Sequence, residues 1–193
     1  MKNIHVRIRK YVFFGFALLI TCRFSINNVC LKNLIMKKLI LILICFPIII
    51  LAQQTFIPGD NFENYLENNG MGNGIPNDDY VATANINTVT YLDVSNQNIS
   101  DLTGIEDFQL LVNLYCNNNH LTSLDINNNN ALAYLQCNGN QLTSLNVSNN
   151  TSLDELGCSF NNLTSLDVSN NIVLFGLGCS GNQIISLDLS NNP

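Results

Sequence analysis

The stretch LVNLYCNNNHLTSLDINNNNA, residues 111–131, decides the fold, because its pattern starts again at residues 132, 153 and 174. Each copy keeps the frame Leu-x-x-Leu-x-Cys-x-x-Asn-x-[Leu/Ile] and repeats every 21 residues. A fixed period near 20 residues is typical of a solenoid, whose coils bury their apolar faces only by stacking on one another. We therefore predict a stack of coils, an architecture that offers a binding surface more readily than a catalytic pocket.

Inside each unit the leucine pattern occurs twice, about ten residues apart. Leu111 and Leu114 are followed by Leu121 and Leu124 in the same arrangement. So short a half-unit has no room for a regular helix, and we expect two extended segments per coil, one on each side. The alternation in Leu-x-Cys and Leu-x-Val points these residues inward.

A distinct segment, residues 53–88, precedes the first repeat and is predicted to cap the solenoid. Asp60 and Glu63 form a capping-box pattern at the start of a short helix, which should end near Asn69. The apolar stripe of this helix consists of Phe62, Tyr65 and Leu66. An amphipathic helix is what the exposed end of a solenoid needs to cover its core.

The repeats, residues 89–193, resemble the leucine-rich repeat family. They comprise one unit of 22 residues and four of 21, the last incomplete. The nested 21-residue unit is similar to the bacterial IRREKO class, the first unit is similar to internalin-type repeats, and residues 57–107 resemble the N-terminal cap of secreted Bacteroidetes members. The resemblance implies a right-handed leucine-rich repeat solenoid, mainly of parallel β-structure with a short N-terminal capping helix, whose usual role is macromolecular recognition.

The N-terminal region has the pattern of a targeting sequence. Residues 36–52, MKKLILILICFPIIILA, combine a basic start with an apolar run, as Sec-type signal peptides do. Residues 1–35 hold a second basic and apolar segment, which we interpret as an upstream extension ahead of a true start at Met36. The alternative is a two-segment membrane anchor. We expect the rest of the chain to be exported, either secreted or held on the outer cell surface.

The charges are strongly segregated along the chain. All eight Lys and Arg lie at or before Lys38, and all fourteen acidic residues lie at or after Asp60. Phosphate backbones and anionic lipids are bound by Lys and Arg. We therefore expect the repeats to bind neither nucleic acid nor anionic membrane, whereas protein and carbohydrate partners remain compatible.

The repeated cysteines and asparagines are predicted to be structural. The cysteines replace Val94 of the first repeat, so we interpret them as small buried hydrophobes, although an exported protein leaves disulfides open. An Asn where the chain turns out of the strand satisfies otherwise unpaired backbone groups. The predicted structural residues are Cys116, Cys137, Cys158, Cys179, Asn119, Asn140, Asn161 and Asn182.

One outward position carries a file of carboxylates: Asp125, Asp167 and Asp188. Oxygen ligands suit calcium, so these residues are weak candidates for a cation site. The alternative is a solvated edge that keeps the coil soluble, and this alternative is favoured. No cofactor is predicted.

No catalytic constellation is present in the repeat pattern. His120 is the single histidine after the signal segment, and no Lys or Arg accompanies it there to stabilise an oxyanion. The prediction is a non-enzymatic recognition or adhesion module. The alternative is a spacer in a longer secreted protein, because the pattern stops part-way through its phase and suggests a fragment, or an exposed end that pairs with another molecule.

The outward positions of the first half-repeat vary from unit to unit, whereas those of the second half are nearly constant. Variation over a constant frame is where a solenoid specifies its ligand, and tyrosine is favoured at interfaces. The alternative is that these positions drift because nothing constrains them. The candidate ligand-binding residues are Asn113, Tyr115, Tyr134, Gln136 and Glu155.

Overall fold

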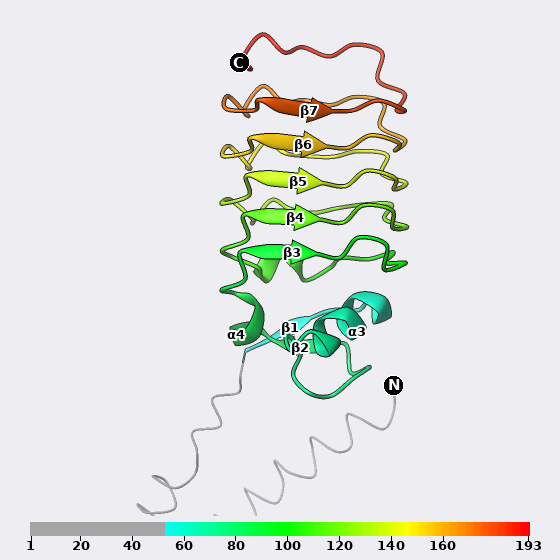
Figure 1. The fold of residues 1–193 in the computed structure, drawn as a ribbon, viewed down its shortest axis with the longest axis vertical. Coiled ribbons are helices and arrows are strands. Elements are labelled where there is room, and N and C mark those ends of the chain that lie inside the picture. Colours follow the sequence, from blue (N-terminus) through cyan, green and yellow to red (C-terminus); the bar gives the residue numbers. More distant parts are fainter. Residues whose placement is uncertain (1–52) are drawn as a thin grey trace, which may run out of the picture. The chain divides into compact units, whose positions relative to one another are not determined.

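Five three-residue strands, one per coil, form a parallel sheet along one side of the molecule (Figure 1). The computed structural model describes residues 53–193, so the predicted extension and signal peptide, residues 1–52, lie outside the described residues. The strands of the sheet are β3 (Tyr91–Asp93), β4 (Asn113–Tyr115), β5 (Tyr134–Gln136), β6 (Glu155–Gly157) and β7 (Gly176–Gly178). Each strand pairs in parallel with the next, with repeat-equivalent residues side by side.

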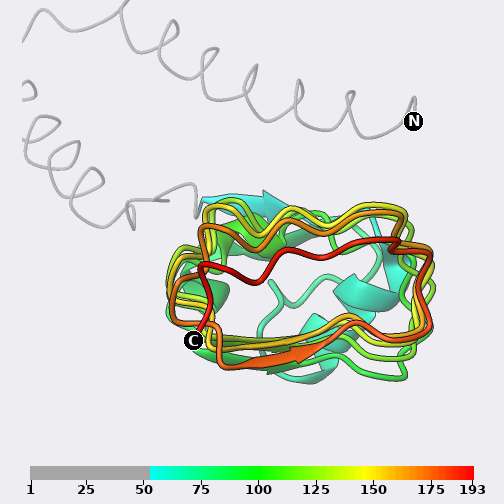
Figure 2. The same ribbon diagram turned by 90° about the horizontal axis from the view of Figure 1, so that it is seen from above.

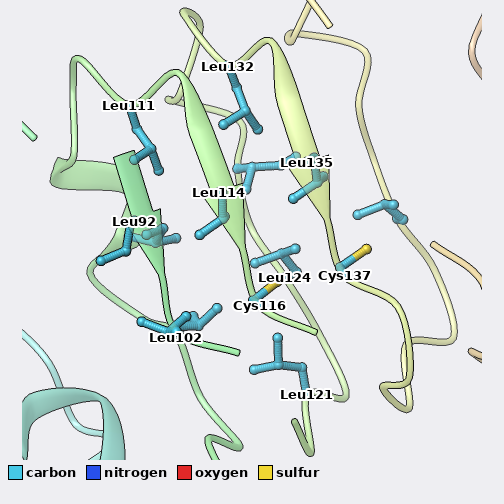
Figure 3. Packing of buried hydrophobic residues seen from close by; sticks show 14 of the residues in the cluster. Leu92, Leu102, Leu111, Leu114, Cys116, Leu121, Leu124, Leu132, Leu135 and Cys137 are labelled. Atoms are coloured by element: carbon cyan, nitrogen blue, oxygen red, sulfur yellow. The ribbon is translucent and has the colours of Figure 1, made fainter. Parts of the chain in front are cut away.

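The core is built from the repeated leucines. The middle residue of each strand points inward, and Leu114 and Leu135 are fully buried (Figure 3). Leu121 and Leu142, from the second half of the same coils, are also fully buried. Burying one such side chain contributes about 1.5–3 kcal/mol. Seen along the stack, each coil is a flattened loop with the strand on one long side (Figure 2).

The two segments predicted for each coil differ in how they pair with neighbouring coils. The second segments form no β-strand in residues 53–193. Their backbones are joined by single hydrogen bonds between coils, such as Gln141 N–H to the Leu121 carbonyl at 2.9 Å. A single backbone bond per pair of coils is not a β-ladder. Buried asparagine side chains, such as that of Asn150, make further hydrogen bonds to backbone carbonyls of the preceding coil.

The N-terminal cap contains two short strands and two helices. Strands β1 (Gln54–Phe56) and β2 (Tyr80–Ala82) pair antiparallel, and helices α3 (Asp60–Asn68) and α4 (Thr83–Ile86) complete the cap. The chain then enters the first repeat, which carries the short 3-10 helix η1 (Ile105–Asp107). None of the helices in residues 53–193 is long and apolar enough to cross a bilayer.

Helix α3 covers the core, as the apolar stripe predicted. Phe62 and Leu66 are fully buried, and the Phe62 ring stacks on Phe108 of the first repeat with centroids 6.2 Å apart. The predicted capping box was wrong. Gly59 is the N-cap residue, and no side chain caps the helix.

The reason is that Glu63 is used elsewhere. Its buried carboxylate accepts the backbone N–H groups of Asp78 and Asp79, at 3.0 and 3.3 Å. Burial is the main cause that raises the pKa of Glu63, and these two N–H groups oppose the rise. The side chain thus ties the loop after α3 to the helix instead of capping its first turn.

Candidate recognition surface

The strands β3 to β7 present two rows of outward-facing residues, which we call the sheet face. Successive residues of a strand point to opposite sides, so the first and third residues of each strand lie on the outer side of the sheet and the middle one on the core side. Gly157 on β6 is buried, because Gln136 covers it. The register places equivalent residues next to one another across all five strands. The first row is Tyr91, Asn113, Tyr134, Glu155 and Gly176, and the second is Asp93, Tyr115, Gln136, Gly157 and Gly178.

Two tyrosines of the sheet face pack against each other. The rings of Tyr91 on β3 and Tyr115 on β4 have centroids 5.5 Å apart and are tilted by 41°. Tyr91 keeps 57% of its surface exposed, so this pair remains accessible. Aromatic pairs in tilted geometry are favourable beyond the area they bury, and the pairing orients both rings.

A third tyrosine is held by a carboxylate. The Tyr134 hydroxyl donates to Asp154 Oδ2 at 3.2 Å, and Asp154 directly precedes β6. This hydrogen bond is the main cause that raises the pKa of Tyr134 above its ordinary value. The same hydrogen bond restrains the Tyr134 side chain, and the residue after Asp154 is the exposed Glu155 of β6.

Gln136 lies over the neighbouring strand because that strand carries a glycine. Its Oε1 accepts the side-chain N–H of Asn138 at 2.9 Å. A Cβ on Gly157 would collide with Gln136 Oε1, so the glycine makes room for this amide. All five candidate residues predicted from the sequence lie together on the sheet face, over β4, β5 and β6.

Two residues of this surface were missed by the sequence reasoning. Tyr91 and Asp93 occupy the equivalent positions of the first repeat, and both are exposed. The candidates were chosen from the cysteine-bearing units, whereas the first unit has Val94 in place of the cysteine. Aligning the units on Leu92 instead would have found both residues.

The four repeat cysteines form a file behind the sheet. Cys116, Cys137 and Cys158 are fully buried, Cys179 is half-buried, and all four are free thiols. Burial is the main cause that raises the pKa of Cys116 and of Cys158, each to about 12. Thiols with such pKa values are unreactive and fill space as small hydrophobes.

Solved structures of other proteins share the fold of this stack of coils. The functional domain of InlJ from Listeria monocytogenes, which includes a cysteine ladder, matches with a TM-score of 0.66 and 36% sequence identity over 73% of this chain. Internalin C2 from the same species matches with a TM-score of 0.53 and 20% identity, over 72% of this chain and 73% of its own. The fold is a leucine-rich repeat solenoid.

The leucine-rich repeat domain of APL1B also matches, with a TM-score of 0.51 and 23% identity, over 57% of this chain and 36% of its own. The chain spans about a third of the InlJ structure, 32% of its length. No protein-family model and no curated protein matches the sequence. The comparisons thus establish the leucine-rich repeat architecture of this solenoid.

The first file of asparagines links each coil of the leucine-rich repeat solenoid to the one before it. Asn161 donates its side-chain N–H groups to the carbonyls of Cys137 and Cys158, both at 3.0 Å, and accepts the Leu142 N–H at 3.0 Å. Asn140 makes the equivalent three bonds one coil earlier. These side chains replace backbone bonds at the corner after each strand.

A second file of asparagines lies at the other corner of the solenoid. Asn150 donates to the carbonyls of Ile126 and Asn129, at 3.0 and 2.9 Å. Its Oδ1 is buried and accepts no hydrogen bond from the described residues. The same holds for Asn129, Asn171 and Asn192. The two corners therefore differ, because the first uses both ends of its amide and the second uses only the donor.

The calcium candidates lie on the side opposite the sheet face. Each carboxylate accepts the backbone N–H two residues further on, at 2.9–3.0 Å, and so closes a local turn. This bond is the main cause that lowers the pKa of Asp167 and of Asp188. Within residues 53–193 no three His, Cys, Asp or Glu side chains converge as metal ligands would. The three calcium candidates are Asp125, Asp167 and Asp188.

Proposed function

We propose that this chain is a non-enzymatic recognition or adhesion module that acts outside the cell and binds a protein or glycan through its sheet face. The observation that carries the proposal is the arrangement of that face. Accessible tyrosine, amide and carboxylate side chains stand on a rigid frame of buried leucines, cysteines and asparagines. Rigid presentation lowers the entropy lost on binding, and tyrosine anchors are common at interfaces.

The export pattern and the relatives support the same function. The basic and apolar segment of residues 36–52 would direct the solenoid out of the cell. We further propose that the repeats belong to the 21-residue IRREKO class, with an internalin-like first unit and a cap of the kind found in secreted Bacteroidetes proteins. The likeness to internalin structures favours a protein partner in general, because leucine-rich repeat solenoids commonly recognise proteins.

The experiment is binding by purified residues 53–193, which contain the whole described core. Glycan arrays and candidate surface proteins are screened for saturable binding, and hits are repeated with the Tyr115→Ala/Tyr134→Ala double variant. Losing two interface tyrosines should weaken binding at least about 30-fold, since such anchors are commonly worth 1–2 kcal/mol or more each.

The matched control is Thr143→Ala/Thr164→Ala, which changes two exposed residues in the second half-repeats. It should leave binding within about twofold of the parent protein. A ligand that binds the tyrosine variant as tightly as the parent would contradict the sheet face as the binding surface. Absence of any saturable ligand would instead favour the spacer alternative.

A further inference from the structure

We infer that the partner bound by the sheet face is a basic protein segment, whose arginine or lysine side chains lie between tyrosine rings and carboxylates. The inference rests on the proposed recognition function and names the chemistry of its partner. Residues 53–193 contain all fourteen acidic residues of the chain and no Lys or Arg. No lysine or arginine of residues 53–193 therefore neutralises the carboxylates of the sheet face, and a basic partner would complement them.

The first pairing of ring and carboxylate lies on β3 and β4. Asp93 and Tyr115 are register partners on adjacent strands, and the ring of Tyr91 lies 5.5 Å from that of Tyr115. One oxygen of Asp93 accepts the Ser95 N–H at 3.0 Å, which orients the carboxylate. A guanidinium group placed over the Tyr115 ring would have a carboxylate at its edge.

The second pairing lies on β5 and β6. Tyr134 and Glu155 are register partners, and Asp154 accepts the Tyr134 hydroxyl at 3.2 Å. Two carboxylates thus flank one ring, and Glu155 is exposed. Cations are attracted to the faces of aromatic rings, most strongly arginine, and carboxylates bind guanidinium groups through paired hydrogen bonds.

The spacing of the two pairings suits an extended peptide. Adjacent strands lie about 4.8 Å apart and residues i and i+2 of one strand about 6.8 Å apart, so Tyr115 and Tyr134 are diagonal neighbours at roughly 8 Å. Side chains two residues apart in an extended peptide point the same way at about 7 Å. A partner with two basic residues separated by one small residue would therefore place one cation at each pairing.

The aromatic and charged side chains of the sheet face lie on β3 to β6. Beyond Glu155 the outward positions are Gly157, Gly176 and Gly178, which offer neither rings nor charges. The inferred footprint is therefore β3 to β6 and not the whole face.

The test uses residues 53–193 and fluorescent peptides of sequence Gly-Ser-Arg-Ser-Arg-Ser-Gly, with lysine or citrulline replacing both arginines, in 0.15 M salt. Citrulline keeps the shape of arginine without its charge. We expect the arginine peptide to bind most tightly, the lysine peptide less tightly, and the citrulline peptide about tenfold or more below arginine. Equal binding of arginine and citrulline peptides would overturn the inference.

Two matched variants distinguish peptide binding at the sheet face from non-specific attraction of the peptide to an acidic protein. Asp154→Asn/Glu155→Gln removes two charges beside Tyr134 of the sheet face, and Asp125→Asn/Asp167→Asn removes two from the opposite side. The first variant should weaken the arginine peptide about fivefold and the second less than about twofold. Equal weakening by both would show non-specific attraction and overturn the inference. Circular dichroism confirms that each variant is folded.

The inference and the proposed function fail in different ways. If a glycan or protein ligand depends on Tyr115 and Tyr134 while none of the peptides binds, the recognition function stands and the basic partner is wrong. If the peptides bind in the expected order and the Tyr115→Leu/Tyr134→Leu variant loses them, both are supported. If neither the peptides nor any array ligand binds saturably, both are wrong.

Discussion

At the scale of single residues, the same amino acid serves the two corners of each coil in different ways. Asn161 satisfies three buried backbone groups, whereas Asn150 satisfies two and leaves its own Oδ1 without a protein donor. A buried polar group left unpaired costs roughly 1–3 kcal/mol. Removing the two side chains should therefore have unequal effects on stability.

We expect Asn161→Ala to lower the free energy of unfolding by roughly 3 kcal/mol or more, because three buried groups lose their partners. Asn150→Ala should cost roughly half as much, because it strands two carbonyls and removes one unsatisfied oxygen. Urea unfolding followed by circular dichroism measures both. An equal or larger loss for Asn150→Ala would contradict the difference between the corners.

The buried thiols should resist alkylation while the solenoid is folded. The pKa of Cys116 and that of Cys158 are each raised to about 12, so at pH 8 each thiol is ionised in roughly one molecule in ten thousand. Iodoacetamide at pH 8, followed by peptide mass spectrometry, should label the half-buried Cys179 first. Cys116 and Cys158 should react only in denaturant. Labelling of Cys116 as fast as Cys179 in the native protein would contradict this expectation.

At the scale of elements, the strands share one sequence pattern but differ in how much of the stack covers them. Leu135 of β5 is fully buried, with strands on both sides, whereas Leu177 of β7 is only half-buried. Stability in a solenoid is approximately a sum of coil terms and nearest-neighbour interfaces. Equivalent leucines in different coils should therefore contribute different amounts.

Leu135→Ala is expected to lower the free energy of unfolding by about 2–5 kcal/mol, because it opens a cavity that rigid neighbours cannot fill. Leu177→Ala, the same substitution in β7, should cost about 1 kcal/mol, because less apolar surface is withdrawn from water. Chemical denaturation of the two variants and the parent decides. Equal losses would mean that coil position does not govern the contribution of these leucines.

At the scale of the whole molecule, the repeats and their cap carry charge of one sign. Residues 53–193 hold fourteen acidic residues and no Lys or Arg, so repulsion between carboxylates opposes the compact state. The short carboxylate turns on one side and the sheet face on the other share this excess. Repulsion between these carboxylates is therefore reduced only by dissolved salt ions, because residues 53–193 hold no lysine or arginine to neutralise them.

Raising sodium chloride from 0.02 to 0.5 M at pH 7 should increase the Tm by several degrees, because the Debye length falls from about 20 Å to about 4 Å. The Asp125→Asn/Asp167→Asn variant, with fewer like charges, should show a smaller increase. Calorimetry of both proteins in both buffers measures the difference. A Tm that falls with salt in the parent protein would rule out charge repulsion as the cause.

Much of the architecture could be predicted from the repeat alone. The 21-residue period places Leu114, Leu135 and Leu156 at one inward position, and the strand register puts them side by side. The five candidate residues fall on one surface for the same reason, since each period returns the chain to the same place on the coil. A period read from the sequence is sufficient to locate a residue on a solenoid.

Only the tertiary structure shows which contacts the neighbouring residues make. It shows that the second half-segments form no strands, that Glu63 binds the loop at Asp78 and Asp79 instead of capping its helix, and that Tyr134 is held by Asp154. These contacts depend on side-chain rotamers and on segments outside the repeat, which no period specifies. The sequence by itself therefore determined where each residue lies on the coil, and packing between coils determined which of them pair.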